Sequence, residues 1–250
     1  MTRLLVSLLA LACATACGTQ YADPISEQPA PAACSSPVAR FDGASYGTAD
    51  RLIQDDFTIE AWVRTASSPP GSTFVEGSAL VFADVEGVQL DDFATGIVGD
   101  HFVISVGGPD TAVTSTSTVT SGQWVHLAVS RKRSDGILLL FVNGALEGSA
   151  VGNDHALDQA STLTLAGRAN RNFYTGLLAD VRLWSTARTQ AQIVANLHHR
   201  LSGTEEGLVG YYRLDQEMSD RLQDSSPSAN DLALTGPVTW PESDVPLCDP

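Results

Sequence analysis

The sequence predicts an all-β antiparallel sandwich with one short helix, and three observations support this fold class. Residues 57–64 alternate between apolar and polar side chains with the period of two that is typical of a half-buried strand. Turn sequences such as Asn143-Gly144 separate many short apolar runs, which favours antiparallel hairpins. A strong helix signal occurs in one segment, so parallel strands joined by helical crossovers are not expected.

Short apolar runs are expected to form the strands, with turn-forming sequences between them. They are residues 57–64, 80–83, 102–106, 124–130, 137–142, 162–165, 177–184 and 208–214. In the first run, the apolar side chains at alternate positions are expected to face the core. Glu60, Trp62 and Arg64 then lie on the opposite face of that strand.

The helix is expected at residues 190–200. Thr189 and Gln192 have the spacing of a capping box, and Gly203 lies beyond the expected end. His198 and His199 fall in the last turn, where positive charge complements the helix dipole. They are therefore interpreted as C-terminal charges rather than metal ligands.

The N-terminus predicts export. Arg3 provides a short positive start, residues 4–11 are apolar, and residues 14–16 are the small residues that signal peptidases prefer before their cut. The apolar stretch is well short of the roughly 20 residues that a membrane-spanning helix needs. Residues 1–16 are therefore interpreted as a signal peptide.

Cys17 follows the small residues directly, and this arrangement resembles the lipobox of bacterial lipoproteins, in which the cysteine is lipidated. A plain secretory signal is the alternative. Residues 17–33 contain three prolines and few apolar groups, so they are expected to form an extended tether. The folded domain is then residues 34–250. The protein is expected to be a membrane-anchored lipoprotein of the bacterial cell envelope, or to be secreted.

Cys34 and Cys248 remain once Cys13 is removed with the signal peptide and Cys17 is lipidated. In an oxidising compartment these two cysteines are expected to form a disulfide between the ends of the folded region. Neither has a histidine or a second cysteine at ligand spacing, so a metal-binding or catalytic role is not expected.

The chain is strongly acidic, with 29 acidic and 14 basic side chains and a net charge of -15. Its only lysine is Lys132. Because no basic stripe is available to neutralise phosphates, a nucleic acid partner is excluded. Contact with a membrane is expected through the lipid anchor only.

Six segments, in order, resemble motifs of laminin-G-like, concanavalin A-like lectin/glucanase domains, the group that includes pentraxins. They are Phe57–Arg64, Trp124–Val129, Leu140–Gly144, Phe173–Leu177, Asp180–Trp184 and Gly207–Tyr212. The match extends from Phe41 to about Trp240. The resemblance implies a two-sheet antiparallel jelly-roll sandwich, with neighbouring termini that suit the expected disulfide and a helix after the strand that carries Asp180.

A jelly roll does not determine a function, so chemistry must come from a site. Glycosidases of this superfamily carry a Glu-x-Asp-x-x-Glu strand, and this sequence has no such triplet and no serine-nucleophile or zinc-protease motif. The acidic residues Asp84, Glu86, Asp91 and Asp92 are interpreted as a solvated loop, with an acid/base pair as the alternative. His126 is interpreted as structural, and no catalytic residue is assigned.

The predicted function is a noncatalytic, surface-exposed recognition or adhesion module for a glycan or an extracellular protein. A carbohydrate-active enzyme and a purely structural envelope lipoprotein are the alternatives. Structural calcium is the one cofactor considered, because related domains hold calcium where Asp42 and Asp180 stand. Otherwise Asp42 stabilises a turn and Asp180 pairs with an arginine such as Arg182.

A candidate ligand face follows from the strand parity, since aromatic and charged groups share one side of two strands. Its residues are Trp62, Arg64, Arg182 and Trp184. An aromatic plane covers the apolar face of a sugar ring while charged groups bind its hydroxyls. Ordinary packing is the alternative for these side chains, and the loops at residues 84–92 and 153–158 are alternative binding regions.

Overall fold

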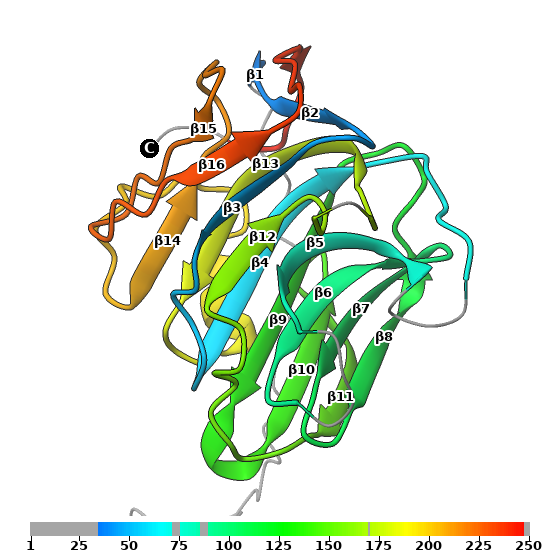
Figure 1. Ribbon diagram of the computed structural model, residues 1–250, viewed down its shortest axis with the longest axis vertical. Helices are drawn as coiled ribbons and strands as arrows, with labels where there is room; N and C mark the ends of the chain where they lie inside the picture. The colour runs from blue at the N-terminus through cyan, green and yellow to red at the C-terminus, as the bar shows by residue number, and fades with distance from the viewer. Residues whose placement is uncertain (1–34, 72–75, 86–89, 170, 248–250) are drawn as a thin grey trace, which may run out of the picture.

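The computed structural model describes residues 35–71, 76–85, 90–169 and 171–247. The predicted signal peptide, the predicted tether, and the cysteines Cys17, Cys34 and Cys248 lie outside the described residues. In the described part, two large antiparallel sheets lie face to face and one α-helix packs beside them (Figure 1). The predicted two-sheet antiparallel sandwich with one short helix is confirmed. No helix among the described residues is long and apolar enough to cross a membrane.

The first sheet has the strand order β11-β10-β9-β4-β13-β14, and β2 pairs with the beginning of β13. Its strands are β2 (Ala39–Asp42), β4 (Phe57–Arg64), β9 (Val125–Lys132), β10 (Ile137–Val142), β11 (Ala145–Val151), β13 (Thr175–Trp184) and β14 (Leu208–Tyr212). We call it the β4 sheet.

The second sheet has the order β15-β16-β3-β12-β5-β6-β7-β8. Its strands are β3 (Tyr46–Asp50), β5 (Ser78–Ala83), β6 (Phe93–Val98), β7 (His101–Val106), β8 (Thr111–Thr118), β12 (Thr162–Leu165), β15 (Arg221–Leu222) and β16 (Leu232–Thr235). We call it the β5 sheet. A separate short pair, β1 (Ser36–Pro37) and β17 (Glu242–Ser243), joins the two ends of the described chain.

The hydrophobic core fills the space between the two sheets. The alternation predicted for β4 is confirmed, because Phe57, Ile59, Ala61 and Val63 enter this core, whereas Trp62 packs on the outer face. The Phe57 ring meets Phe93 of the β5 sheet with 5.0 Å between ring centroids. Each fully buried aromatic or aliphatic side chain of this kind contributes about 1.5–3 kcal/mol of transfer free energy, so the two inner faces supply the main driving force for folding.

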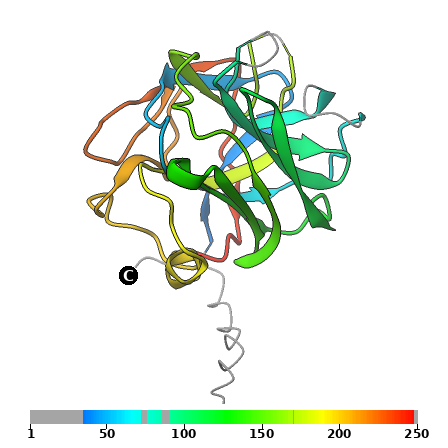
Figure 2. The ribbon, with the colours of Figure 1, turned by 90° about the horizontal axis from the view of Figure 1, so that it is seen from below.

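Helix α1 (Gln190–Asn196) packs on the outer face of the β4 sheet, as Figure 2 shows. The predicted capping box is present, since the Thr189 hydroxyl accepts from the Gln192 amide and the Gln192 side chain accepts from the Thr189 amide. The helix ends earlier than the predicted Arg200. Arg182 of β13 donates to the carbonyls of Asn196 and His199, which a longer helix would use in its own ladder.

Candidate ligand-binding site

The ligand face predicted from strand parity is covered in the structure. Trp62, Arg182 and Trp184 are 3%, 0% and 1% exposed. The Trp62 indole donates to the carbonyl of Leu197, just after α1, at 3.1 Å. Arg64 is partly exposed and pairs with Asp244 at 2.9 Å. The candidate ligand face is therefore wrong for Trp62, Arg182 and Trp184, and the alternative of ordinary packing holds for them, because α1 and the chain that follows it pack over these residues.

Beneath α1 lies a cluster of buried charges centred on Glu60. Its carboxylate lies 3.4 Å from the His126 ring, 3.6 Å from the Arg182 guanidinium and 3.7 Å from that of Arg188. Burial by itself raises the pKa of Glu60, but His126 and the two arginines outweigh it and hold the pKa below its ordinary value. Burial lowers the pKa of His126 in turn. This cluster holds the outer face of the sheet to its covering segment, and His126 lies within it as a packed side chain.

The two carboxylates considered for calcium are not brought together. Asp42 lies opposite Thr175 at the start of β13, and its Oδ1 atom accepts from the Ala44 amide at 3.0 Å in a turn. Asp180 lies further along β13, where it accepts from the Tyr211 hydroxyl at 2.6 Å and pairs with Arg182. The guanidinium of Arg182 thus stands where a cation at Asp180 would bind.

Among the described residues, no three histidine, cysteine or acidic side chains are grouped as metal ligands. The residues around Asp42 and Asp180 therefore do not fit a calcium ion, which takes six to eight oxygen ligands.

A depression of about 520 Å³ opens on the outer face of the β5 sheet. Its floor is formed by Phe82 of β5 and Thr164 of β12, which are directly paired across the two strands. Its walls come from the segments that flank these strands, namely residues 84–85, 159–162, 168–169 and 171. We call it the β5–β12 pocket.

An ion pair crosses the β5–β12 pocket. The Arg168 guanidinium lies 2.9 Å from the Asp84 carboxylate, and the two side chains are 12% and 19% exposed. The same guanidinium lies over the Phe82 ring at 4.5 Å from its centroid, a cation–π contact that orients the arginine. On the floor, the hydroxyl of Thr164 is buried and has no hydrogen-bond partner among the described residues. The lining of the pocket thus includes a carboxylate, a guanidinium and an unpaired, buried hydroxyl.

The acidic residues of the loop at 84–92, which the sequence predicted to be solvated, differ in their surroundings. Burial and the neighbouring Asp92 carboxylate raise the pKa of Asp84 to about 6, although Arg168 opposes the shift. Burial also raises the pKa of Asp92, whose Oδ2 atom accepts from the Val85 amide at 3.0 Å. Asp91 instead turns to the 153–158 loop, where its carboxylate lies 3.3 Å from the His155 ring. Glu86 lies outside the described residues.

The raised pKa of Asp84 predicts a pH-dependent stability. An unfolded chain releases this proton near 3.8, whereas the folded chain keeps it up to about pH 6. Between these values the folded state binds more protons, so the free energy of unfolding should fall as pH rises from about 4 to 6. Denaturation of Asp84→Asn, measured across this range, should show a smaller decrease than the unchanged chain. Asp158→Asn, at an exposed carboxylate nearby, should keep the original dependence, and identical curves for all three proteins would contradict the assignment.

Sequence reasoning missed the arginine and the threonine of this pocket. Arg168 lies in a turn between two predicted strands. Thr164 lies in a predicted strand, but the sequence did not predict that this strand pairs with β5. The available signal was the pair of threonines at alternate positions in residues 162–165, which marks one face of that strand as polar.

The amino-acid sequence of the chain is similar to those of a known domain family and of other proteins. The family model of the concanavalin A-like lectin/glucanases superfamily matches residues 41–194, a range that includes every residue of the β5–β12 pocket. The adhesion G-protein coupled receptor V1 of Danio rerio is 25% identical in an alignment of 181 residues that covers 68% of this chain. The match spans only 3% of the receptor.

Two solved structures share the fold. A candidate carbohydrate-binding protein from Bacteroides ovatus superposes with a TM-score of 0.69 at 18% identity, covering 86% of this chain and 62% of that one. Domain 4 of an extracellular arabinanase from Geobacillus stearothermophilus, solved with arabinotriose, superposes with a TM-score of 0.52 at 17% identity over 63% of this chain and 75% of that one. From the matched residues and the sandwich they form, the chain belongs to the concanavalin A-like lectin/glucanases superfamily.

Proposed function

We propose that the protein is a noncatalytic recognition module that binds a saccharide in the β5–β12 pocket. The observation that carries the proposal is the mostly buried Asp84–Arg168 ion pair at a depression of about 520 Å³. That volume falls within the range of about 300–1,000 Å³ that is typical of small-molecule sites.

Sugar hydroxyls both donate and accept hydrogen bonds, and this pocket offers partners for each role. The Asp84 carboxylate accepts and the Arg168 guanidinium donates. Hydrogen bonds that involve a charged partner are stronger than neutral ones. Because the ion pair and the cation–π contact already hold Arg168, little side-chain entropy is lost when a ligand binds.

Two solved structures with the same fold support a saccharide as the ligand. The Bacteroides structure is named for candidate carbohydrate binding, and the arabinanase domain was solved with a trisaccharide. Since both are less than 25% identical to this chain, they lend support through the shared fold only.

The test is a glycan array probed with the fragment 34–250. At least one glycan should bind, and Arg168→Ala should weaken binding tenfold or more, because a hydrogen bond to a charged group contributes about 1.5–3 kcal/mol. The matched control is Arg64→Ala, which removes a partly exposed arginine of the outer β4 face and should leave binding unchanged. Binding that survives Arg168→Ala would contradict the assignment to this pocket.

A carbohydrate-active enzyme is a second candidate function. It is favoured by the closeness of two carboxylates, since Asp92 helps to raise the pKa of Asp84. A hydrolase panel run on the same fragment separates the two functions. Release of sugar that Asp84→Asn or Asp92→Asn abolishes would replace the binding function with catalysis. A structural envelope protein would give a different result. It would bind no glycan on the array and would be recovered with a protein partner after crosslinking.

Export and lipidation form part of the proposed function. The signal peptide at 1–16, the lipidated Cys17 and the tether at 17–33 would hold the sandwich outside the cell, beside the glycans it binds. The intact mass of the protein extracted from membranes tests this arrangement. A mass that lacks residues 1–16 and includes an added diacylglyceryl group is expected, and an unmodified Cys17 would contradict the anchor.

A further inference from the structure

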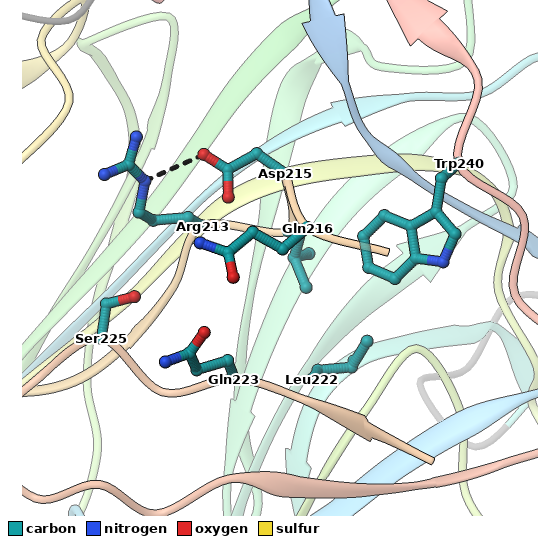
Figure 3. A pocket seen from close by; sticks show the side chains of 8 residues that line it. Arg213, Asp215, Gln216, Leu222, Gln223, Ser225 and Trp240 are labelled. Atoms are coloured by element: carbon teal, nitrogen blue, oxygen red, sulfur yellow. Dashed lines mark hydrogen bonds and ion pairs between the residues drawn. The ribbon is translucent and has the colours of Figure 1, made fainter. Parts of the chain in front are cut away.

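A second recess lies where the edges of the two sheets meet. Strand β14 ends the β4 sheet, and β15 ends the β5 sheet. The groove lies between the chain that leaves β14 and the short β15, with Trp240 closing one side (Figure 3). It shares no lining residue with the β5–β12 pocket, and two strands, β16 and β3, separate β15 from β12 in the sheet.

Two glutamines present free amide groups in this groove. Gln216 and Gln223 are exposed, and neither side chain has a hydrogen-bond partner among the described residues. Their amides extend into the same space, with Ser225 beside them (Figure 3). A free amide offers two donors and one acceptor oxygen, so this pair matches the mixed donor and acceptor character of sugar hydroxyls.

The rest of the groove is held firmly. The Asp215 carboxylate pairs with the guanidinium of Arg213 at 2.9 Å and with that of Arg200 at 3.2 Å. These two ion pairs fix its orientation. Leu214, immediately before it, is buried and has a φ of 58°, in the left-handed region that a leucine rarely adopts. Such a strained residue persists only where its surroundings hold it, and it occurs most often at functional sites.

Trp240 supplies the apolar surface. The residue is partly buried against the core, and part of it remains exposed beside the groove. An indole plane covers the apolar face of a sugar ring, and polar groups next to it bind the hydroxyls at the rim of that ring. The space inside the groove is about 10 Å³, which is the room of one water-sized group.

We propose that this groove is a second saccharide-binding site, in which one hydroxyl of a sugar enters between Gln216 and Gln223 while the ring lies against Trp240. The choice of a saccharide as the ligand rests on the proposed function. The location of the second site does not, because it follows from the groove itself. Two sites on one domain would let a single polymer chain be held at two points, which raises the overall affinity without new contacts at either site.

The test follows the indole NMR signals of the purified full chain during titration with the methyl glycosides of glucose, galactose, mannose, xylose and arabinose. Trp240→Phe identifies the signal of Trp240. That signal should move saturably with at least one glycoside. Gln223→Ala should weaken the effect about fivefold, because a neutral hydrogen bond contributes about 1 kcal/mol.

The controls separate this site from the β5–β12 pocket. Arg168→Ala should leave the Trp240 response unchanged, and so should Gln123→Ala, which removes another exposed glutamine. If no glycoside moves the Trp240 signal while the array still detects binding through Arg168, the second site is overturned and the proposed function stands. A Trp240 response that Arg168→Ala abolishes, or that Gln223→Ala leaves intact, would also overturn it.

Discussion

Arg182→Met is expected to lower the free energy of unfolding by about 3–5 kcal/mol, the usual cost of removing one partner from a buried ion pair. Arg182 is fully buried and pairs with Asp180 and Glu60. Its guanidinium also donates to the carbonyls of Asn196 at 2.9 Å and His199 at 2.7 Å. Methionine would remove these hydrogen bonds to the two carbonyls, and would leave Asp180 with the Tyr211 hydroxyl and Glu60 with His126 and Arg188.

Chemical denaturation measures this effect, and a surface pair provides the control. Arg221 and Asp231 form an ion pair of 3.3 Å with side chains 51% and 36% exposed. Arg221→Met should therefore cost no more than about 1 kcal/mol. Glu60→Gln combined with Arg182→Met should cost less than the sum of the single changes, because both act on one network. An Arg182→Met protein as stable as the original would contradict the structural role of the buried cluster.

Loss of the predicted Cys34–Cys248 disulfide is expected to lower the free energy of unfolding by roughly 5 kcal/mol at most, since the closed loop includes nearly the whole domain. The described neighbours of the two cysteines favour this pairing. Strand β1 pairs with β17, with Ser36 opposite Ser243, and the Ser35 hydroxyl donates to Glu242 at 2.9 Å. The two ends of the sandwich are thus held side by side.

Single and double variants distinguish a disulfide from two separate thiols. Cys34→Ser and Cys248→Ser should be equally destabilised, and the double variant should be no less stable than either, because all three lack the same bond. Thermal unfolding under nonreducing conditions measures these differences, and reduction of the unchanged protein should reproduce them. Additive losses, or two free thiols in the exported protein by mass spectrometry, would contradict the pairing.

Local patterns predicted the elements whose structure depends on near neighbours. The strands at 57–64, 137–142 and 162–165 have the predicted bounds. The cap at Thr189 was also predicted, because its hydrogen bonds reach only three residues along the chain. Strand β8 was missed, since Thr111–Thr118 is mostly threonine and serine with no apolar alternation, and its pairing with β7 establishes it as a strand.

The sequence by itself determined the sandwich, because period-two alternation and turn residues act over a few positions and bury two apolar faces against each other. It also showed that Trp62 and Arg182 share the outer face of the β4 sheet. Only the tertiary structure decided that α1 covers this face and that the β5–β12 pocket, the proposed binding site, lies on the other sheet. Phe82, Asp84, Thr164 and Arg168 meet because β5 pairs with β12, a contact between strands some 80 residues apart that no local pattern encodes.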